Sequence, residues 1–240
     1  MPQLPLILFD IDGTLLRSGD RTHSYSVRLA CQEFFQIAAD TPIPAEVDLA
    51  GRTDRRILVT LLAAHGIPLE RSEPRLPEMF AFMEEYVASR VPSLIEWVLP
   101  GVPDLLAALA ARDLTQGLVT GNLPRIAEAK LAAAGLWKPF ARADGVIGGF
   151  GHASVERDDL PPIALDLAGK ALGRPIPGTD AVLIGDTPHD IACARACGAR
   201  IIAVATGRFS PDALRPYNPD LLVADLTDTA ALLRFIGNEG

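Results

Sequence analysis

The chain has 240 residues, a length that accommodates one large domain or a core with a smaller second unit. Its hydrophobic fraction of 49% is sufficient for a buried core, and its net charge of −8 argues against a nucleic-acid partner. No stretch is apolar for long enough to span a membrane, and the 3 cysteines fit no disulfide framework. Because the N-terminus also lacks the pattern of a signal peptide, we expect a cytoplasmic protein.

The first predicted element is a buried strand over residues 4–9, which ends at two carboxylates one residue apart, Asp10 and Asp12. Gly13 and Thr14 follow them directly. Ligands of open parallel sheets bind at the carboxyl ends of the strands, so we expect both carboxylates at a binding site. Two acids this close repel each other unless a cation or a shared proton relieves them, and hard oxygen ligands favour Mg²⁺. The alternative is an ordinary Asp-rich turn.

The stretch from about Leu16 to Leu99 shows no convincing strand and contains three segments with apolar residues at helical spacing, residues 25–39, 54–65 and 75–91. An insertion of this length is better explained by a separate helical unit than by one loop. We therefore predict a helical cap over residues 16–98, and a core formed by residues 1–15 and 99–240.

Strands and helices alternate after residue 99, which indicates a parallel sheet covered by helices on both faces. The predicted fold class is therefore α/β, a Rossmann-like parallel sheet with an inserted helical cap. Further strands are expected at residues 117–120, 146–147, 181–184, 201–204 and 221–223. Helices are expected at residues 102–112, 123–134, 161–172 and 188–197, and a last helix, capped by Asp225 or Thr227, is expected to run to about residue 236.

Two further groups of polar residues follow predicted strands. Thr120, Gly121 and Asn122 stand between a strand and a helix, where a hydroxyl, an amide and a helix N-terminus can bind phosphoryl oxygens. Capping of the helix by Thr or Asn is the alternative. Asp186 follows the strand over residues 181–184, and Asp190 comes four residues later, which gives the chain a second acid pair.

These three segments resemble motifs of the haloacid dehalogenase-like hydrolases, most of whose members are Mg²⁺-dependent phosphatases. They are Asp10-Ile11-Asp12-Gly13-Thr14, Thr120-Gly121-Asn122 and Gly185-Asp186-Thr187-Pro188-His189-Asp190. The cap and the motif set are most similar to those of the phosphoglycolate phosphatases.

The resemblance implies a role for each of these residues. Asp10 would be the nucleophile and Asp12 the acid–base group, and the residues of the second motif would bind the phosphoryl group. Mg²⁺ would be held by Asp10, Asp186 and the backbone carbonyl of Asp12, with Asp190 binding a metal-bound water or orienting its loop. In the cap, Arg52 stands at a helix start and is our candidate for binding the part of the substrate beyond the phosphoryl group. The alternative is that it pairs with surface acids.

The chain departs from the family at the third motif, where a lysine is expected. Lys130, Lys138 and Lys170 all fall at other positions, so none stands where the family places its lysine. Arg157, just before a predicted helix, is our candidate for the missing cation, because a guanidinium bridges carboxylate and phosphate oxygens. The alternative is a solvated arginine paired with a neighbouring aspartate.

The sequence thus predicts Mg²⁺-dependent hydrolysis of a small phosphorylated metabolite through an aspartyl-phosphate, by a monomer or homodimer. A phosphomutase of the β-phosphoglucomutase type shares these motifs and stays an alternative, as does a non-catalytic ligand-binding module on the same scaffold. A haloalkanoate dehalogenase is disfavoured because that branch lacks an acid at the position of Asp12. A phosphonatase is disfavoured because that branch also lacks an acid at this position and because it needs a lysine in the cap, whereas residues 16–99 contain none.

Overall fold

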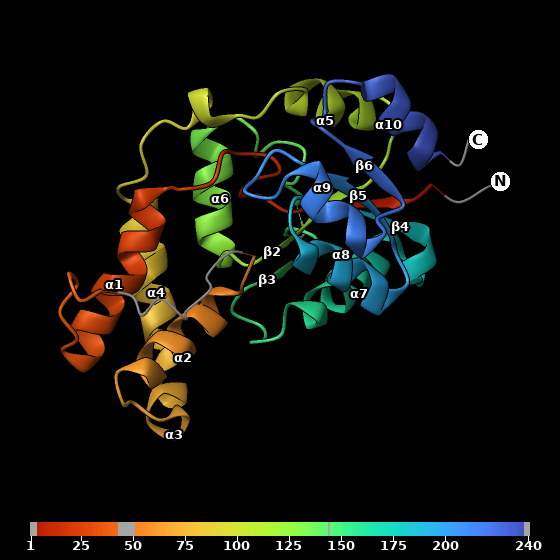
Figure 1. Ribbon diagram of the computed structural model, residues 1–240. Coiled ribbons are helices and arrows are strands. Elements are labelled where there is room, and N and C mark those ends of the chain that lie inside the picture. Colours follow the sequence, from red (N-terminus) through yellow and green to blue (C-terminus); the bar gives the residue numbers. More distant parts are fainter. Residues whose placement is uncertain (1–3, 43–50, 144, 238–240) are drawn as a thin grey trace.

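The computed structural model describes residues 4–42, 51–143 and 145–237, so parts of the predicted cap (43–50) and core (1–3, 144 and 238–240) lie outside it. Within these ranges, six parallel strands form one sheet in the order β3-β2-β1-β4-β5-β6 (Figure 1). The central strand β1 (Leu6–Phe9) pairs with β2 (Gln116–Thr120) and β4 (Ala181–Gly185). The outer strands are β3 (Gly148–Phe150), β5 (Arg200–Val204) and β6 (Leu221–Val223).

Helices cover both faces of the sheet because successive side chains of each strand point to opposite sides. Ile7 and Phe9 pack on the face covered by α5 (Val102–Ala110), α6 (Pro124–Ala133) and α10 (Thr229–Ile236). Leu6 and Leu8 pack on the face covered by α7 (Leu160–Leu172), α8 (Pro188–Cys197) and α9 (Pro211–Leu214). Figure 1 shows α5 and α10 on one side of the sheet and α7 and α8 on the other. The predicted α/β fold is confirmed.

One strand lies later than predicted. The sequence indicated a strand at residues 146–147, whereas β3 is formed by Gly148, Gly149 and Phe150. A Cβ atom on Gly149 would lie 2.1 Å from the carbonyl oxygen of Leu160, the first residue of α7. The strand therefore uses glycine because α7 packs directly on its backbone, a reason that strand propensity does not reveal.

Between β1 and β2 the chain forms the predicted helical insertion, and we use the name cap for its helices. They are α1 (Arg21–Phe35), α2 (Asp54–Ala64), α3 (Leu69–Ser72) and α4 (Leu76–Ala88). The connections leading out to the cap and back pair with each other at Leu16 and Val98. Single 3₁₀ turns lie at Glu73–Arg75, Ile95–Trp97, Arg157–Asp159, Gly178–Asp180 and Arg215–Tyr217.

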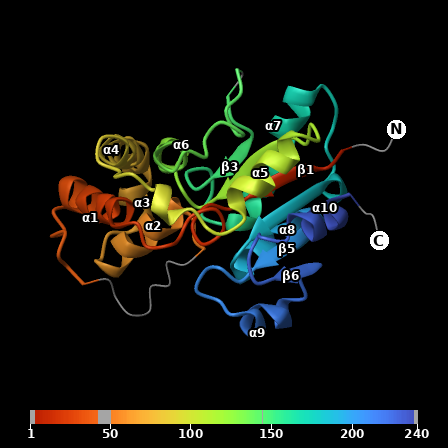
Figure 2. The ribbon, with the colours of Figure 1, turned by 90° about the horizontal axis from the view of Figure 1, so that it is seen from above.

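The cap has an apolar core of its own, formed by α1, α2 and α4, and it includes Leu123, just before α6, and Ile126 in the first turn of that helix. Figures 1 and 2 both place α6 beside α4. A helix of the sheet layer therefore packs against the cap at one end and against the sheet at the other. None of the described helices combines the length and the apolar character needed to cross a membrane.

Candidate active site

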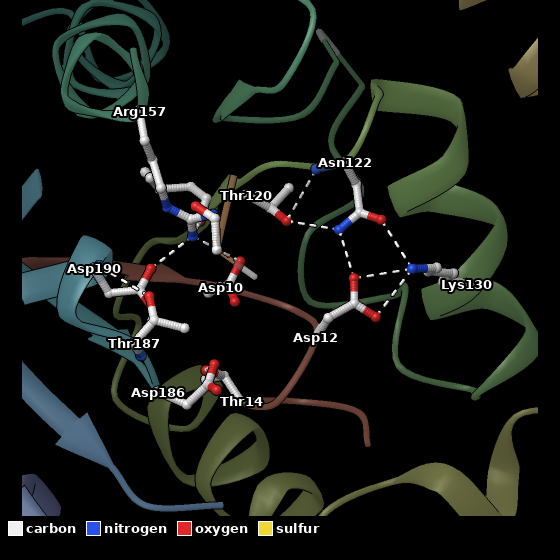
Figure 3. A network of polar contacts seen from close by, with 12 residues as sticks. Asp10, Asp12, Thr14, Thr120, Asn122, Lys130, Arg157, Asp186, Thr187 and Asp190 are labelled. Atoms are coloured by element: carbon white, nitrogen blue, oxygen red, sulfur yellow. Dashed lines mark hydrogen bonds and ion pairs between the residues drawn. The ribbon is translucent and has the colours of Figure 1, made fainter. Parts of the chain in front are cut away.

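The predicted site residues gather at the carboxyl ends of the three central strands. Asp10 follows β1, Thr120 ends β2 and Asp186 follows β4 (Figure 3). Because neighbouring parallel strands end at the same edge, residues far apart in the sequence come together there. With the cap, they enclose a cavity of about 290 Å³. Its walls include Asp10, Asp12, Arg52, Thr120, Gly121, Asn122, Arg157 and Asp186.

Three buried aspartates form a cluster that could hold a metal ion. Asp10, Asp186 and Asp190 each offer one carboxylate oxygen, and these oxygens lie within 4.8 Å of one another. Burial, reinforced by the other two carboxylates, raises the pKa of Asp186 to about 9. Burial also raises the pKa of Asp10 to about 6, although the Arg157 guanidinium opposes this. A divalent cation would relieve the repulsion, and a set of hard oxygen donors fits Mg²⁺.

Two glycines allow the chain to close around Asp186. A Cβ on Gly13 would lie 2.3 Å from Asp186 Oδ2, and one on Gly207 would lie 1.7 Å from the same oxygen. Gly13 also has φ +99°, a conformation that favours glycine. The hydroxyl of Thr14 donates to the other carboxylate oxygen at 3.2 Å. The first motif therefore shapes the surroundings of this carboxylate as well as supplying Asp10.

The two oxygens of Asp190 already accept hydrogen bonds. Oδ2 accepts from the backbone N–H and the hydroxyl of Thr187 at 2.9 and 2.7 Å, in a capping box at the start of α8. Oδ1 accepts from Arg157 at 2.6 Å. A carboxylate held in this way suits the second of its two predicted roles, which is to orient the loop.

Arg157 is buried at the site rather than solvated, with only 7% of its surface exposed. Its Nη2 atom donates to Asp10 Oδ1 at 2.9 Å and to Asp190 Oδ1 at 2.6 Å. Desolvation opposes its charge, but Asp190 and Asp10 outweigh that effect and raise the pKa of Arg157. Nη1 donates to the carbonyl oxygen of Gly51, so the same side chain also contacts the cap.

Asp12 lies apart from the acid cluster, and its carboxylate points toward Lys130 (Figure 3). Lys130 Nζ lies 3.0 and 2.9 Å from the two carboxylate oxygens, and Asn122 Nδ2 donates to Oδ2 at 2.8 Å. Burial alone would raise the pKa of Asp12, but the charge of Lys130 and the hydrogen bonds from Lys130 and Asn122 outweigh it, and the pKa lies below its usual value. Asn122 Nδ2 also donates to the hydroxyl of Thr120. The second motif is thus connected to the first.

Lys130, which the sequence analysis did not select because it falls within a helix, is buried at the site, with 2% of its surface exposed. The sequence did carry a signal. On α6, Lys130 lies four residues after Ile126 and three after Ala127, and all three face inward. A lysine within the apolar stripe of a helix must find a partner, since an unpaired buried charge is costly.

The cap docks on the core through the start of α2. The N–H groups of Asp54 and Arg55 donate to the carbonyl oxygens of Gly121 and Gly151 at 2.8 and 3.0 Å. In return, the Asp54 carboxylate accepts from the N–H of Leu123 at 2.9 Å. These contacts place Arg52, the predicted substrate-binding residue, on the wall of the cavity.

The comparisons with known proteins agree with this geometry. The model of a family described as haloacid dehalogenase-like hydrolase matches residues 7–195. The chain belongs to this family. A probable phosphatase, IndB, of Dickeya dadantii is 30% identical over 233 residues, which cover 91% of this chain and 89% of that protein. The phosphoglycolate phosphatase of Rhodospirillum rubrum is 28% identical over 205 residues, covering 84% of this chain and 79% of that protein.

Among solved structures, a β-phosphoglucomutase of Clostridium difficile superposes with a TM-score of 0.68 at 17% identity, covering 99% of this chain and 98% of its own. At that identity the likeness shows the fold alone. The sequence relatives cover core and cap alike, so the chain is a haloacid dehalogenase-like hydrolase whose relatives are phosphatases.

In this hydrolase, we expect Asp186→Asn to raise the melting temperature of the metal-free protein at neutral and alkaline pH. The pKa of Asp186 is about 9 in the fold, against an ordinary value of 3.8, so the folded protein retains a proton that the unfolded chain releases. The stability linked to that proton is complete below about pH 4 and is lost as the pH rises toward 9. An amide carries no charge throughout this range. Thermal melts of both proteins across about pH 5 to 9 measure the difference.

Mg²⁺ should reverse the order of the two melting temperatures, so that the wild type melts above Asp186→Asn. A metal binds the ionised carboxylates, so it should raise the melting temperature of the wild type increasingly as the pH rises, and that of Asp186→Asn much less. The control is Asp166→Asn on α7, whose carboxylate is 63% exposed and should change neither result. Full stabilisation of Asp186→Asn by Mg²⁺ would show that Asp186 is not a ligand.

We also expect Gly121→Ala to weaken cap docking. The added Cβ would lie 2.0 Å from the carbonyl oxygen of Arg52, and a backbone atom cannot move aside without moving the start of α2. A displacement of this kind should lower kcat/KM about 10- to 100-fold while the melting temperature changes little. Gly121→Val should lower kcat/KM further. Equal activity of all three proteins would contradict the docking contact.

Proposed function

We propose that this hydrolase cleaves a small phosphomonoester in an Mg²⁺-dependent reaction through an aspartyl-phosphate intermediate. The observation that carries the proposal is the position of Asp10. Its buried carboxylate lies on the wall of the cavity, within the acid cluster, and Arg157 holds one of its oxygens. A fixed, partly neutralised carboxylate beside a metal site is suited to attack on phosphorus.

The other site residues support the two halves of this reaction. Asp10 attacks phosphorus as the P–O bond to the leaving group breaks, and Asp12 gives a proton to the departing oxygen. In the second half, Asp12 takes a proton from the water that hydrolyses the phosphorylated Asp10. The hydroxyl of Thr120 and the guanidinium of Arg157 bind the phosphoryl oxygens as charge spreads over them, while the amide of Asn122 holds Thr120 and Asp12 in place.

Mg²⁺ would be held by the carboxylates of Asp10 and Asp186 and by the backbone carbonyl of Asp12, with Asp190 orienting the loop. When bound, it supplies positive charge to the acid cluster and to the phosphate oxygens. Arg52 provides a cation on the cap side of the cavity for the rest of the substrate.

The relatives named as phosphoglycolate phosphatases direct the first test toward small anionic esters. Release of inorganic phosphate is measured with and without Mg²⁺ from p-nitrophenyl phosphate, phosphoglycolate, sugar phosphates and nucleotides. We expect release that depends on Mg²⁺ and disappears in Asp10→Asn. A folded, Mg²⁺-binding protein that releases phosphate from none of them would contradict the proposal. A product with its phosphoryl group moved to another oxygen would indicate a mutase, and binding of these compounds without turnover would indicate a non-catalytic module.

A further inference from the structure

A continuous set of polar contacts joins the Asp12 carboxylate to the cap. Lys130 Nζ contacts both carboxylate oxygens and also lies 3.1 Å from His23 Nδ1. His23 Nε2 lies 3.0 and 3.1 Å from the two oxygens of Asp54. His23 belongs to α1 and Asp54 to α2, whereas Lys130 belongs to α6 in the sheet layer. The connection therefore crosses from cap to core.

The hydrogen-bonding capacity of Lys130 fixes the direction of these contacts. An ammonium group has three N–H donors and no acceptor. One donor serves Asp12, one serves Asn122 Oδ1 at 2.9 Å, and the third is directed at His23 Nδ1. In this arrangement Nδ1 accepts, and the ring proton lies on Nε2, where it is donated to Asp54. Every donor of the ammonium group is thus satisfied, as a buried lysine requires.

Asp54 closes the network into a ring. Its carboxylate accepts from the N–H of Leu123, just before α6, and the same helix carries Lys130 one and a half to two turns later. Asp54 is 1% exposed, and the side chain of His23 is 14% exposed. Both ends of this stretch of α6 are therefore tied to the cap, and the ammonium group lies at the end that faces Asp12.

We propose that Lys130, oriented by the cap pair His23–Asp54, is the positioning residue that holds the Asp12 carboxylate ready to exchange a proton with the leaving group. Asn122 also holds Asp12, but the orientation of Lys130 then depends on docking of the cap, which ties proton transfer to enclosure of the substrate. Lys130 keeps its own proton throughout; the proton that moves passes between Asp12 and the ester oxygen. This inference rests on the proposed phosphatase function.

The leaving group gives a test that a purely structural role would not pass. An alkyl phosphate needs a proton on its departing oxygen, whereas p-nitrophenolate leaves without one. kcat/KM reports only the steps up to the first irreversible one, which is phosphorylation of Asp10. We expect Lys130→Met, which keeps the length of the side chain, to lower kcat/KM about 100-fold for an alkyl phosphate and several-fold at most for p-nitrophenyl phosphate. The control is Lys170→Met, because the Lys170 side chain is 70% exposed on α7.

A double mutant shows whether Lys130 acts through Asp12. In an Asp12→Asn background, Lys130→Met should cause little further loss for the alkyl phosphate, because the group that it positions is already gone. His23→Leu should also lower kcat/KM selectively for the alkyl phosphate, by about tenfold. It serves as the second variant if Lys130→Met does not fold. Its control is His65→Leu, just after α2, where ring Nδ1 lies 2.8 Å from the Leu61 carbonyl oxygen.

The outcomes separate the two proposals. Equal losses for both esters in Lys130→Met, or additive losses in the double mutant, would overturn the positioning role while the phosphatase function stands. A wild-type protein that hydrolyses neither ester would overturn both. A selective loss in Lys130→Met and His23→Leu, absent from the two controls, would establish the positioning role.

Discussion

Asp10→Asn is expected to reduce phosphate release by roughly 10⁴-fold or more while leaving the protein folded. An amide oxygen is a poor nucleophile, so the covalent step is lost. The change is nearly isosteric, and the Asn oxygen can still accept the hydrogen bond that Arg157 donates at 2.9 Å. Release from p-nitrophenyl phosphate and thermal melts without metal measure the two effects.

Removal of the Asp10 charge should not lower the melting temperature of the metal-free protein. Burial raises the pKa of this carboxyl to about 6, which means that its ionised form is disfavoured in the fold. The matched control is Asp104→Asn on the exposed side of α5, which should behave as wild type in both measurements. A folded Asp10→Asn protein with substantial turnover would rule out the covalent mechanism. Acid quenching during turnover should trap a phosphorylated protein in the wild type and none in the variant.

The sheet and the acid cluster were predictable because they depend on local patterns. Apolar runs such as residues 4–9 end in polar residues, and parallel strands bring those ends to one edge. Asp10 and Asp186 are 176 residues apart in numbering, but they follow the adjacent strands β1 and β4, so the two motifs alone indicate a shared site. The carboxylates of the cluster could be assigned without knowing how the cap sits.

The contacts of Lys130, His23 and Asp54 were not predictable in the same way. They depend on the rotation of α6 about its axis and on where α1 and α2 lie above the sheet, which tertiary packing decides. Only the buried position of Lys130 on its helix could have been detected. Arg157 was selected because no lysine stood at the expected place, and the structure does bring it to Asp10 and Asp190.

The site divides its positive charge between two buried cations with different partners. Arg157 serves the acid cluster through Asp10 and Asp190, whereas Lys130 serves Asp12. Each cation also contacts the cap, Arg157 at the Gly51 carbonyl and Lys130 at His23. Docking of the cap thus bears on the proposed nucleophile and on the proposed acid–base group through separate side chains. Substitution of Arg157 and substitution of Lys130 should therefore have distinguishable effects on activity.

Arg157→Ala is expected to lower kcat about 10²- to 10³-fold, because a donor to the phosphoryl oxygens is lost together with the neutralisation of Asp10. It should also destabilise the metal-free protein by about 3–5 kcal/mol, since two buried carboxylates lose their partner. The loss of stability should grow as the pH rises, because without the guanidinium the pKa of Asp10 moves further upward and ionisation in the fold becomes costlier. Kinetics and denaturant unfolding across about pH 5 to 8 test these effects.

Arg157→Lys separates charge from geometry. An ammonium group keeps the positive charge but lacks the planar fork that joins Asp10, Asp190 and the Gly51 carbonyl oxygen, so we expect it to recover part of the rate and most of the stability. Arg234→Ala on the exposed side of α10 controls for removal of an arginine. If the folded Arg157→Ala protein hydrolyses p-nitrophenyl phosphate at the wild-type rate, no cation is needed beside Asp10. The buried arginine would then stabilise the acid cluster alone, and binding of the phosphoryl group would fall to Thr120.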